Sequence, residues 1–127
     1  MNVKNVAERL GVSEYTIRYY TNEDLIPHLK RDKNNSRVFD EESIKWLEMI
    51  ILLRTCGMSI NAIREYIDLC LIGNETAQQR KNIVVEQKQK IDSKLAELQS
   101  CSERLEKKIE LYDEIIQNHR KDITEKL

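Results

Sequence analysis

A ten-residue stretch near the N-terminus decides the fold of this chain: Gly11-Val12-Ser13-Glu14-Tyr15-Thr16-Ile17-Arg18-Tyr19-Tyr20. The residues before it place apolar side chains at the spacing of one helix face, namely Val3, Val6, Ala7 and Leu10. This spacing predicts a short amphipathic helix that ends where Gly11 can adopt a left-handed conformation. Ser13 can then cap a second helix from Glu14 to about Asn22, with Ile17 turned inward. Two short helices joined by a turn that contains glycine predict a helix-turn-helix.

The segment that follows, residues 25–39, lacks helical spacing. Pro27 favours an extended chain, and a polar, basic run lies between Leu29 and Val38. The turn residues Asn34-Asn35 stand in the middle of that run. We therefore predict a two-stranded wing beside the helix-turn-helix.

Two longer helices are predicted after the wing. Asp40 can cap the first of them, which carries one apolar stripe of Ile44, Leu47, Ile50 and Ile51 and another of Trp46, Met49 and Leu53. A helix that is apolar on two sides must be covered on two sides. Gly57 ends this helix and Ser59 caps the next, with Met58 and Ile63 spaced as a hydrophobic staple. The stripe expected to be buried on this fourth helix is Ile60, Ile63, Ile67 and Cys70.

The last part of the chain has the pattern of a coiled coil. Thr76 and Gln79 have the spacing of a capping box, and no Gly or Pro follows them. A seven-residue repeat runs through Val84, Ile91, Leu98, Leu105 and Tyr112, with Leu95, Ile109 and Ile116 in the partner row. A helix from Ala77 to about Asn118 would be roughly 60 Å long. Because no other segment of the chain is left to cover this seam, we expect a second copy to cover it.

Length and composition agree with a small, mainly α protein. The chain has 127 residues, of which 40% are hydrophobic and 6% aromatic, with only 3 Gly and 1 Pro, so a β-sandwich or barrel is excluded. The expected organisation is a winged helix-turn-helix domain over residues 1–73 and a long coiled-coil helix over 76–119 that a second copy covers. A C-terminal tail is expected at 120–127.

Overall charge does not indicate a nucleic-acid binder, because the formal net charge is −1. A local patch does. The wing segment carries five basic or imidazole side chains against the single acidic residue Asp32: His28, Lys30, Arg31, Lys33 and Arg37. A solvated hairpin tip would also be charged, but the position beside a helix-turn-helix favours phosphate contact.

The helix-turn-helix stretch closely resembles the signature of MerR-type transcription regulators. The resemblance continues through four further motifs: Leu25-Ile26-Pro27, Arg37-Val38-Phe39, Trp46-Leu47 and Leu53-Arg54-Thr55-Cys56-Gly57-Met58-Ser59. It covers roughly residues 2–71, and the long helix matches the family's antiparallel dimerisation helix in position and length. The resemblance implies a homodimer that binds double-stranded promoter DNA. Similar members bind a palindrome in an over-long promoter spacer, bend and untwist it, and so act on RNA polymerase indirectly through the promoter.

The resemblance and the side-chain chemistry together give a set of expected DNA-binding residues: Ser13, Tyr15, Thr16, Arg18, Tyr19, Lys30, Lys33 and Arg37. Arg18 and the tyrosine hydroxyls suit phosphates, while Thr16 is short enough to let the helix approach base edges. Arg37 matches the family's wing arginine. Tyr20 is expected to be a core aromatic residue.

The chain departs from the family pattern at several positions. Thr21 stands where a glutamate usually follows the two tyrosines, Asp24 where a glycine usually precedes Leu25, and Asn35-Ser36 where the wing often has Gly-Tyr. The motifs look most like the small branch without an effector-binding domain that responds to aldehyde and thiol stress. That branch's sensing cysteine position is Leu52 here. Cys56, one helical turn later, is the candidate sensing residue, and a packing role is the alternative.

Other classes of function find little support in the sequence. The three cysteines show no CxxC spacing and, with His28 and His119, no metal-ligand spacing, so we expect no metal, no cofactor and no disulfide framework. No nucleophile with a base and no phosphate loop indicates an enzyme. With no membrane span, the chain is expected in the cytoplasm. The alternative to a DNA-binding regulator is a coiled-coil adaptor whose winged head docks a protein.

Overall fold

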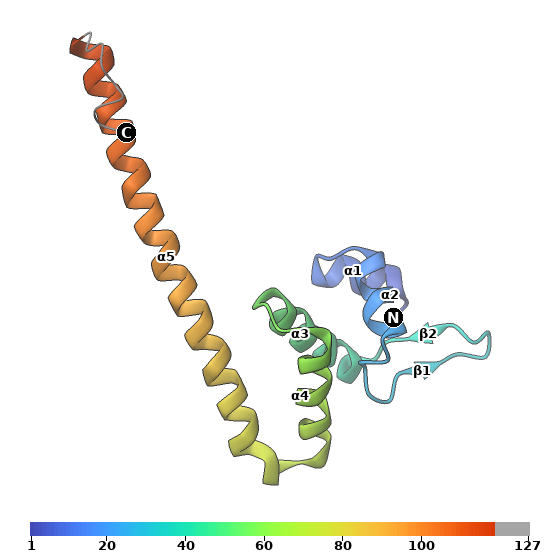
Figure 1. Cartoon of the computed structure of the whole chain (residues 1–127). Helices are drawn as coiled ribbons and strands as arrows, with labels where there is room; N and C mark the ends of the chain where they lie inside the picture. Colours follow the sequence, from blue (N-terminus) through green and yellow to red (C-terminus); the bar gives the residue numbers. More distant parts are fainter. Residues whose placement is uncertain (119–127) are drawn as a thin grey trace. The chain divides into compact units, whose positions relative to one another are not determined.

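The computed structural model describes residues 1–118, so the expected tail at 120–127 lies outside the described residues (Figure 1). The chain divides into two compact units. Residues 1–84 form the first, which we call the head, and the second begins at Val85 and continues the long helix. The architecture is mainly helical with a small two-stranded wing and a long C-terminal helix, as the sequence predicted.

The head begins with the predicted helix-turn-helix, α1 (Val3–Leu10) and α2 (Glu14–Asn22). The Asn2 side chain caps α1, and Gly11 ends it in the left-handed conformation with φ 69°. Ser13 caps α2 by accepting a hydrogen bond from the backbone N–H of Thr16 at 3.1 Å. Local side-chain chemistry therefore fixes both ends of the turn, as expected from the sequence.

The wing is an antiparallel pair of short strands, β1 (Lys30–Arg31) and β2 (Arg37–Val38), with Arg31 opposite Arg37 (Figure 1). Behind it, Asp40 caps α3 (Glu41–Thr55) and Ser59 caps α4 (Ile60–Ile72), which confirms both predicted caps. These caps fix where α3 and α4 begin. Both helices turn apolar side chains toward the same hydrophobic core.

One core holds the head together. Its largest fully buried side chains come from every helix of the helix-turn-helix, the wing end and the α3–α4 pair: Val6, Ile17, Leu25, Phe39, Ile44, Leu47, Ile50 and Ile63. The predicted second stripe of α3 is covered less completely, because Leu53 is buried while Trp46 and Met49 are half-buried. The helix-turn-helix, the wing end and α3–α4 thus share a single packing centre.

Two expectations around the end of α4 were wrong. Cys70, expected in the core, is half-buried, as is Ile60 at the other end of the same stripe. Thr76 does not cap the long helix: it lies in a short 3-10 helix, η1 (Asn74–Thr76), where its hydroxyl donates to the carbonyl oxygens of Leu69 and Gly73 at 2.6 and 2.9 Å. Arg80 donates to the Thr76 hydroxyl from its Nε atom. The Thr76 hydroxyl therefore satisfies carbonyl oxygens at the end of α4, which lack a partner within that helix, rather than capping the N–H groups of the next helix.

The long helix α5 (Ala77–Asn118) has the predicted extent. No residue in it is buried, and the whole apolar seam is exposed. No helix within residues 1–118 has the length and apolar character needed to cross a membrane.

Candidate nucleic-acid interface

The outer face of α2 presents residues at i, i+3, i+4 and i+7: Tyr15, Arg18, Tyr19 and Asn22, all exposed. Ile17 and Tyr20 point the other way into the core, and burial raises the pKa of Tyr20. This confirms the core interpretation of Tyr20. Tyr15 is 77% exposed and Tyr19 38% exposed, so both hydroxyls are available to an external partner. The face combines one cation with phenolic donors, which suits contact with phosphate oxygens.

Ser13 and Thr16 lie together at the start of α2. Their hydroxyl oxygens are 2.9 Å apart and share a hydrogen bond, while the Ser13 oxygen also accepts from the Thr16 backbone N–H. Ser13 therefore has a structural role as the cap in addition to its predicted place in the interface. Thr16 is half-buried, and its short side chain projects little from this end of the helix. Another molecule can therefore approach the helix backbone closely here.

Arg18 is the central cation of this face. Its guanidinium lies 3.6 Å from the Glu14 carboxylate, one helical turn earlier, and the two side chains are 56% and 46% exposed. An exposed pair at this distance contributes little to stability. Arg18 can therefore exchange Glu14 for a phosphate at small cost.

The tip of the wing is organised by Asp32, its one acidic residue. The Asp32 carboxylate accepts from the backbone N–H groups of Asn34 and Ser36 at 2.9 and 3.0 Å. Asn35 completes the turn with a left-handed φ of 61°. The carboxylate is thus engaged with loop backbone, and Lys33 stands exposed beside it without an ion pair among residues 1–118.

The other predicted wing lysine has a partner at the start of α3. Lys30 Nζ lies 3.6 Å from an Asp40 carboxylate oxygen. The pKa of Asp40 is lowered mainly by hydrogen bonds from the Ser43 backbone and hydroxyl, and to a smaller extent by the charge of Lys30. The pair is exposed, so Lys30 remains close to the wing surface but carries less uncompensated charge than Lys33.

Arg37 is held between the wing and α2. Its guanidinium donates to the Thr21 hydroxyl and, at 2.8 Å, to the Asn22 side-chain oxygen. Sequence reasoning missed these two partners, which lie 16 and 15 residues away along the chain. The sequence predicted that Arg37 contacts a DNA phosphate, and that contact remains a prediction.

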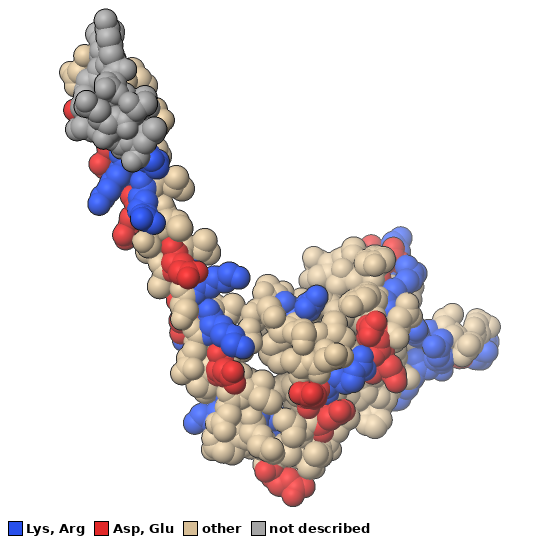
Figure 2. Space-filling model, viewed as in Figure 1, with Lys and Arg blue, Asp and Glu red and all other residues tan. Residues whose placement is uncertain are grey.

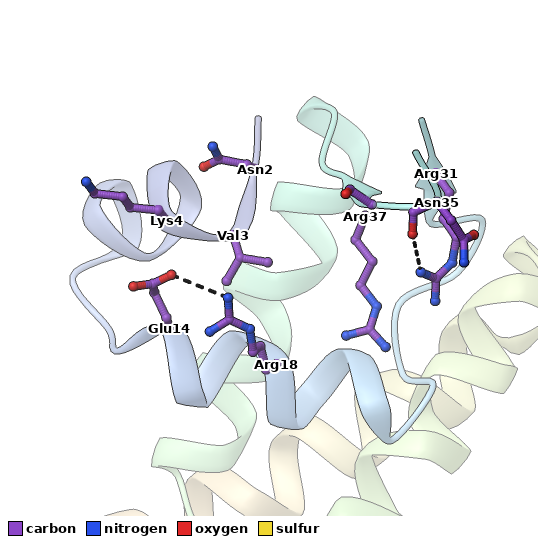
Figure 3. Close-up of a pocket in the computed structure, with 9 residues that line it drawn as sticks. Asn2, Val3, Lys4, Glu14, Arg18, Arg31, Asn35 and Arg37 are labelled. Atoms are coloured by element: carbon purple, nitrogen blue, oxygen red, sulfur yellow. Dashed lines mark hydrogen bonds and ion pairs between the residues drawn. The ribbon is translucent and has the colours of Figure 1, made fainter. Parts of the chain in front are cut away.

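A recess of about 480 Å³ lies between the start of α1, the outer face of α2 and the wing. It gathers four cationic side chains around one carboxylate: Lys4, Arg18, Arg31 and Arg37, with Glu14. In Figure 3, Arg37 points from the wing toward α2, while Arg18 on α2 is directed to Glu14. Figure 2 shows Lys and Arg side chains gathered where the wing joins the helices of the head. Lys4 was absent from the predicted residues, and Arg31 was predicted only as a member of the basic wing patch, because nothing in the local sequence shows that the two lie beside Arg18.

The remaining candidate, Cys56, lies at the C-terminal cap of α3 and is half-buried. Leu52, one turn earlier, is 60% exposed. Within residues 1–118, no three His, Cys, Asp or Glu side chains are grouped so that they could hold a metal ion.

The fold and this surface define a winged helix-turn-helix protein of the DNA-binding class. The sequence model of the family described as MerR HTH family regulatory protein matches residues 1–70. The sequence model of the family described as MerR, DNA binding matches residues 44–108. The chain belongs to the MerR family, and it is a MerR-type DNA-binding transcriptional regulator.

Individual relatives agree with that assignment. The chain is 42% identical to the HTH-type transcriptional regulator AdhR of Bacillus subtilis over 91 residues, which cover 72% of this chain and only 65% of AdhR. It is 30% identical to the regulator ZntR of Escherichia coli K12 over 83% of this chain and 75% of ZntR. Among solved structures it resembles HiNmlR, a MerR family regulator lacking the sensor domain, bound to promoter DNA. The TM-score is 0.79 and the identity 29%, over 91% of this chain and 92% of that one.

Proposed function

We propose that this regulator acts as a homodimer that binds a promoter palindrome, distorts the DNA and so affects RNA polymerase through the promoter. The observation that carries the dimer is the seam of α5. Its eight apolar side chains from Val84 to Ile116 are between 37% and 71% exposed in a single chain. Apolar side chains that repeat every seven residues over this length are stable in water only when another helix covers them.

A dimer built in this way would also explain how the DNA is distorted. A continuous helix is a stiff connection, so the separation of two DNA-binding heads would be fixed by helix length rather than by a flexible linker. A duplex that contacts both heads must then bend or untwist to reach them, and the deformation energy depends on its sequence. HiNmlR, which is similar over most of its length, has been seen on promoter DNA.

The test is a mobility-shift titration on the promoter upstream of the chain's own gene, with a scrambled duplex of equal length and composition as the control. The expected result is one complex with two chains per duplex and an affinity that falls steeply with salt. Circularly permuted probes should migrate differently, because the bend changes position. Equal affinity for the two duplexes would contradict a promoter-specific regulator and favour the adaptor alternative.

A thiol input through Cys56 is the second part of the proposal. Cys56 ends α3 and Met58 begins the staple of α4, so a modified thiol would alter the junction of the two helices. The thiol is half-buried rather than sealed in the core. In a promoter transcription assay with an electrophile, Cys56→Ser should abolish the change in transcription. An unchanged induction ratio would leave Cys56 with a packing role.

The proposal places the protein in the cytoplasm with promoter DNA and assigns it no catalytic activity.

A further inference from the structure

We propose that the two α5 helices of the dimer pair in the register that places Leu95 of one helix opposite Leu98 of its partner, and that charged side chains beside the seam select this register. The proposal rests on the dimer of the proposed function and adds how its two chains fit together. The helices pair antiparallel, because Lys88 occupies a seam position. Parallel helices would place two Lys88 ammonium groups in one layer, whereas antiparallel helices separate them.

The seam of α5 consists of two rows, and in an antiparallel pair each residue of one row faces a residue of the other. The rows are Val84, Ile91, Leu98, Leu105 and Tyr112, and Lys88, Leu95, Ser102, Ile109 and Ile116. Only shifts by whole heptads keep the rows facing each other. Two such shifts let residues 77–118 cover all eight apolar seam side chains. Leu98 faces the partner's Leu95 in one, the leucine register, and the partner's Ser102 in the other, the serine register.

The two registers differ first at the middle of the dimer. In the leucine register, Leu95 and Leu98 of both helices form two adjacent apolar layers at the two-fold axis. Ser102 then lies away from the axis, opposite the partner's Ile91. In the serine register, both layers at the axis pair Leu98 with Ser102, so a hydroxyl and the space beside a small side chain lie at the centre. The leucine register therefore packs the centre better.

Charged residues beside the seam disfavour the serine register. Side chains that flank the seam of an antiparallel pair face flanking side chains of the partner. In the serine register, Lys94 faces the partner's Lys108, and Asp92 faces the partner's Glu106. Two-fold symmetry repeats each contact on the other side of the axis. The serine register therefore brings like charges together on both flanks of the seam, which is destabilising.

The leucine register avoids these contacts. Every facing pair beside the seam then joins a charged residue to an uncharged one, for example Lys94 to the partner's Cys101 and Asp92 to the partner's Gln99. Asp92 is left to its own helix, where its carboxylate accepts a hydrogen bond from Lys88 Nζ at 2.7 Å. This ion pair holds the Lys88 ammonium at the flank, so the aliphatic part of the side chain can cover the apolar residue opposite it.

Disulfide cross-linking distinguishes the two registers. Diamide takes up the two electrons and two protons that a pair of thiols loses when a disulfide forms. In the leucine register, Lys94→Cys places a thiol opposite the partner's Cys101, so this variant should form a covalent dimer roughly tenfold faster than the wild type. In the serine register the two Cys101 thiols face each other, so the wild type would cross-link as fast. Equal rates would overturn the proposal.

Two further variants control for other thiols. Lys94→Cys combined with Cys101→Ser keeps Cys56, Cys70 and the new thiol but removes the expected pairing partner. Lys90→Cys places a thiol on the outer face of the helix. Both should cross-link no faster than the wild type. Fast cross-linking in the first control would contradict the pairing of residues 94 and 101.

Dimer affinity gives an independent readout. In the leucine register, Gln99→Lys places an ammonium group opposite the partner's Asp92 at two symmetric positions, so the dimer should tighten by roughly threefold at low salt. Gln99→Glu should weaken it by a similar factor. In the serine register Gln99 faces its own copy, so either charge would weaken the dimer. Sedimentation equilibrium at several protein concentrations measures both variants. Unchanged or weaker association of Gln99→Lys would overturn the leucine register.

The same experiments separate a failure of the register from a failure of the dimer. If the wild type is monomeric at micromolar concentration, the proposed dimer fails and the register fails with it. If the wild type is a dimer but Lys94→Cys cross-links no faster than the wild type, the dimer stands and only the register is wrong. The expected result is a wild-type dimer in which the Lys94→Cys variant forms a disulfide between residues 94 and 101, identified by peptide mass spectrometry.

Discussion

The head and the long helix use the same apolar residue types in opposite ways. In the head, Leu47 and Ile63 have no exposed surface, and the helix ends are closed by side-chain caps. In the second unit, Leu98 and Ile109 are more than half exposed although their spacing is just as regular. A regular apolar pattern is therefore no measure of burial. The head satisfies its pattern within one chain, whereas the helix needs an external surface to satisfy its own.

The largest effect should come from placing a charge in the helix seam. Leu98→Asp puts a carboxylate where the proposed dimer would bury an apolar side chain, so the dimer should dissociate and promoter affinity should fall by more than about 100-fold. Ser100→Asp places the same charge on the outer face of the helix and should leave the dimer intact. Sedimentation velocity and a mobility shift report both effects. Equal behaviour of the two variants would remove the distinction between seam and outer face.

Cavity formation in the head should come next. Ile63→Ala removes a fully buried side chain and should lower the free energy of unfolding of the head by about 2–5 kcal/mol, with no change in dimer affinity. Ile109→Ala makes the same chemical change in the seam and should weaken dimer association instead. Denaturant unfolding at several protein concentrations separates the two. A large loss of dimer affinity in Ile63→Ala would show that the core and the seam are not independent.

The junction of α4 and α5 should give a smaller effect. Thr76→Val keeps the side-chain shape but removes the hydroxyl that bonds Leu69, Gly73 and Arg80, so stability should fall by about 1–3 kcal/mol. Thr55→Val removes an exposed hydroxyl bonded to the Ile51 oxygen and should cost less than about 0.5 kcal/mol. Thermal unfolding followed by circular dichroism compares them. Equal costs would mean that burial of Thr76 does not strengthen its hydrogen bonds.

The smallest effect is expected at a backbone position. Asp24 has a φ of 56°, which is strained for a residue with a Cβ atom. This conformation explains why a glycine suits the position, and Asp24→Gly should stabilise the head by up to about 1 kcal/mol. Asp68→Gly, inside α4, should destabilise it by about the same amount. If Asp24→Gly is also destabilising in the same unfolding experiment, strain does not decide this position.

Most of the fold could be predicted because local signals specify it. Ser13, Asp40 and Ser59 cap helices through backbone groups only three residues away, and Gly11 ends a helix by its own conformation. Seven-residue spacing without Gly or Pro was enough to predict one long continuous helix in this part of the chain. These signals depend on neighbours in sequence, so the sequence alone displays them.

The candidate interface could be predicted only in part. The outer face of α2 follows from helical spacing, but the partners of Arg37 depend on how the wing packs against α2. Thr21 looked like a departure from a family pattern, whereas the structure gives its hydroxyl two hydrogen bonds. Thr76 was misread because the capping-box spacing is local and its actual partners, Leu69 and Gly73, precede it. Contacts between elements need the packed structure.

The central claim is that a second copy of this chain covers the α5 seam and that two heads bind one duplex. The most direct test is the molar mass of the wild-type protein by light scattering at micromolar concentration, alone and with its promoter duplex. The account predicts twice the chain mass of 15.1 kDa without DNA and two chains per duplex with it. A single-chain mass without DNA, together with one chain per duplex, would contradict it.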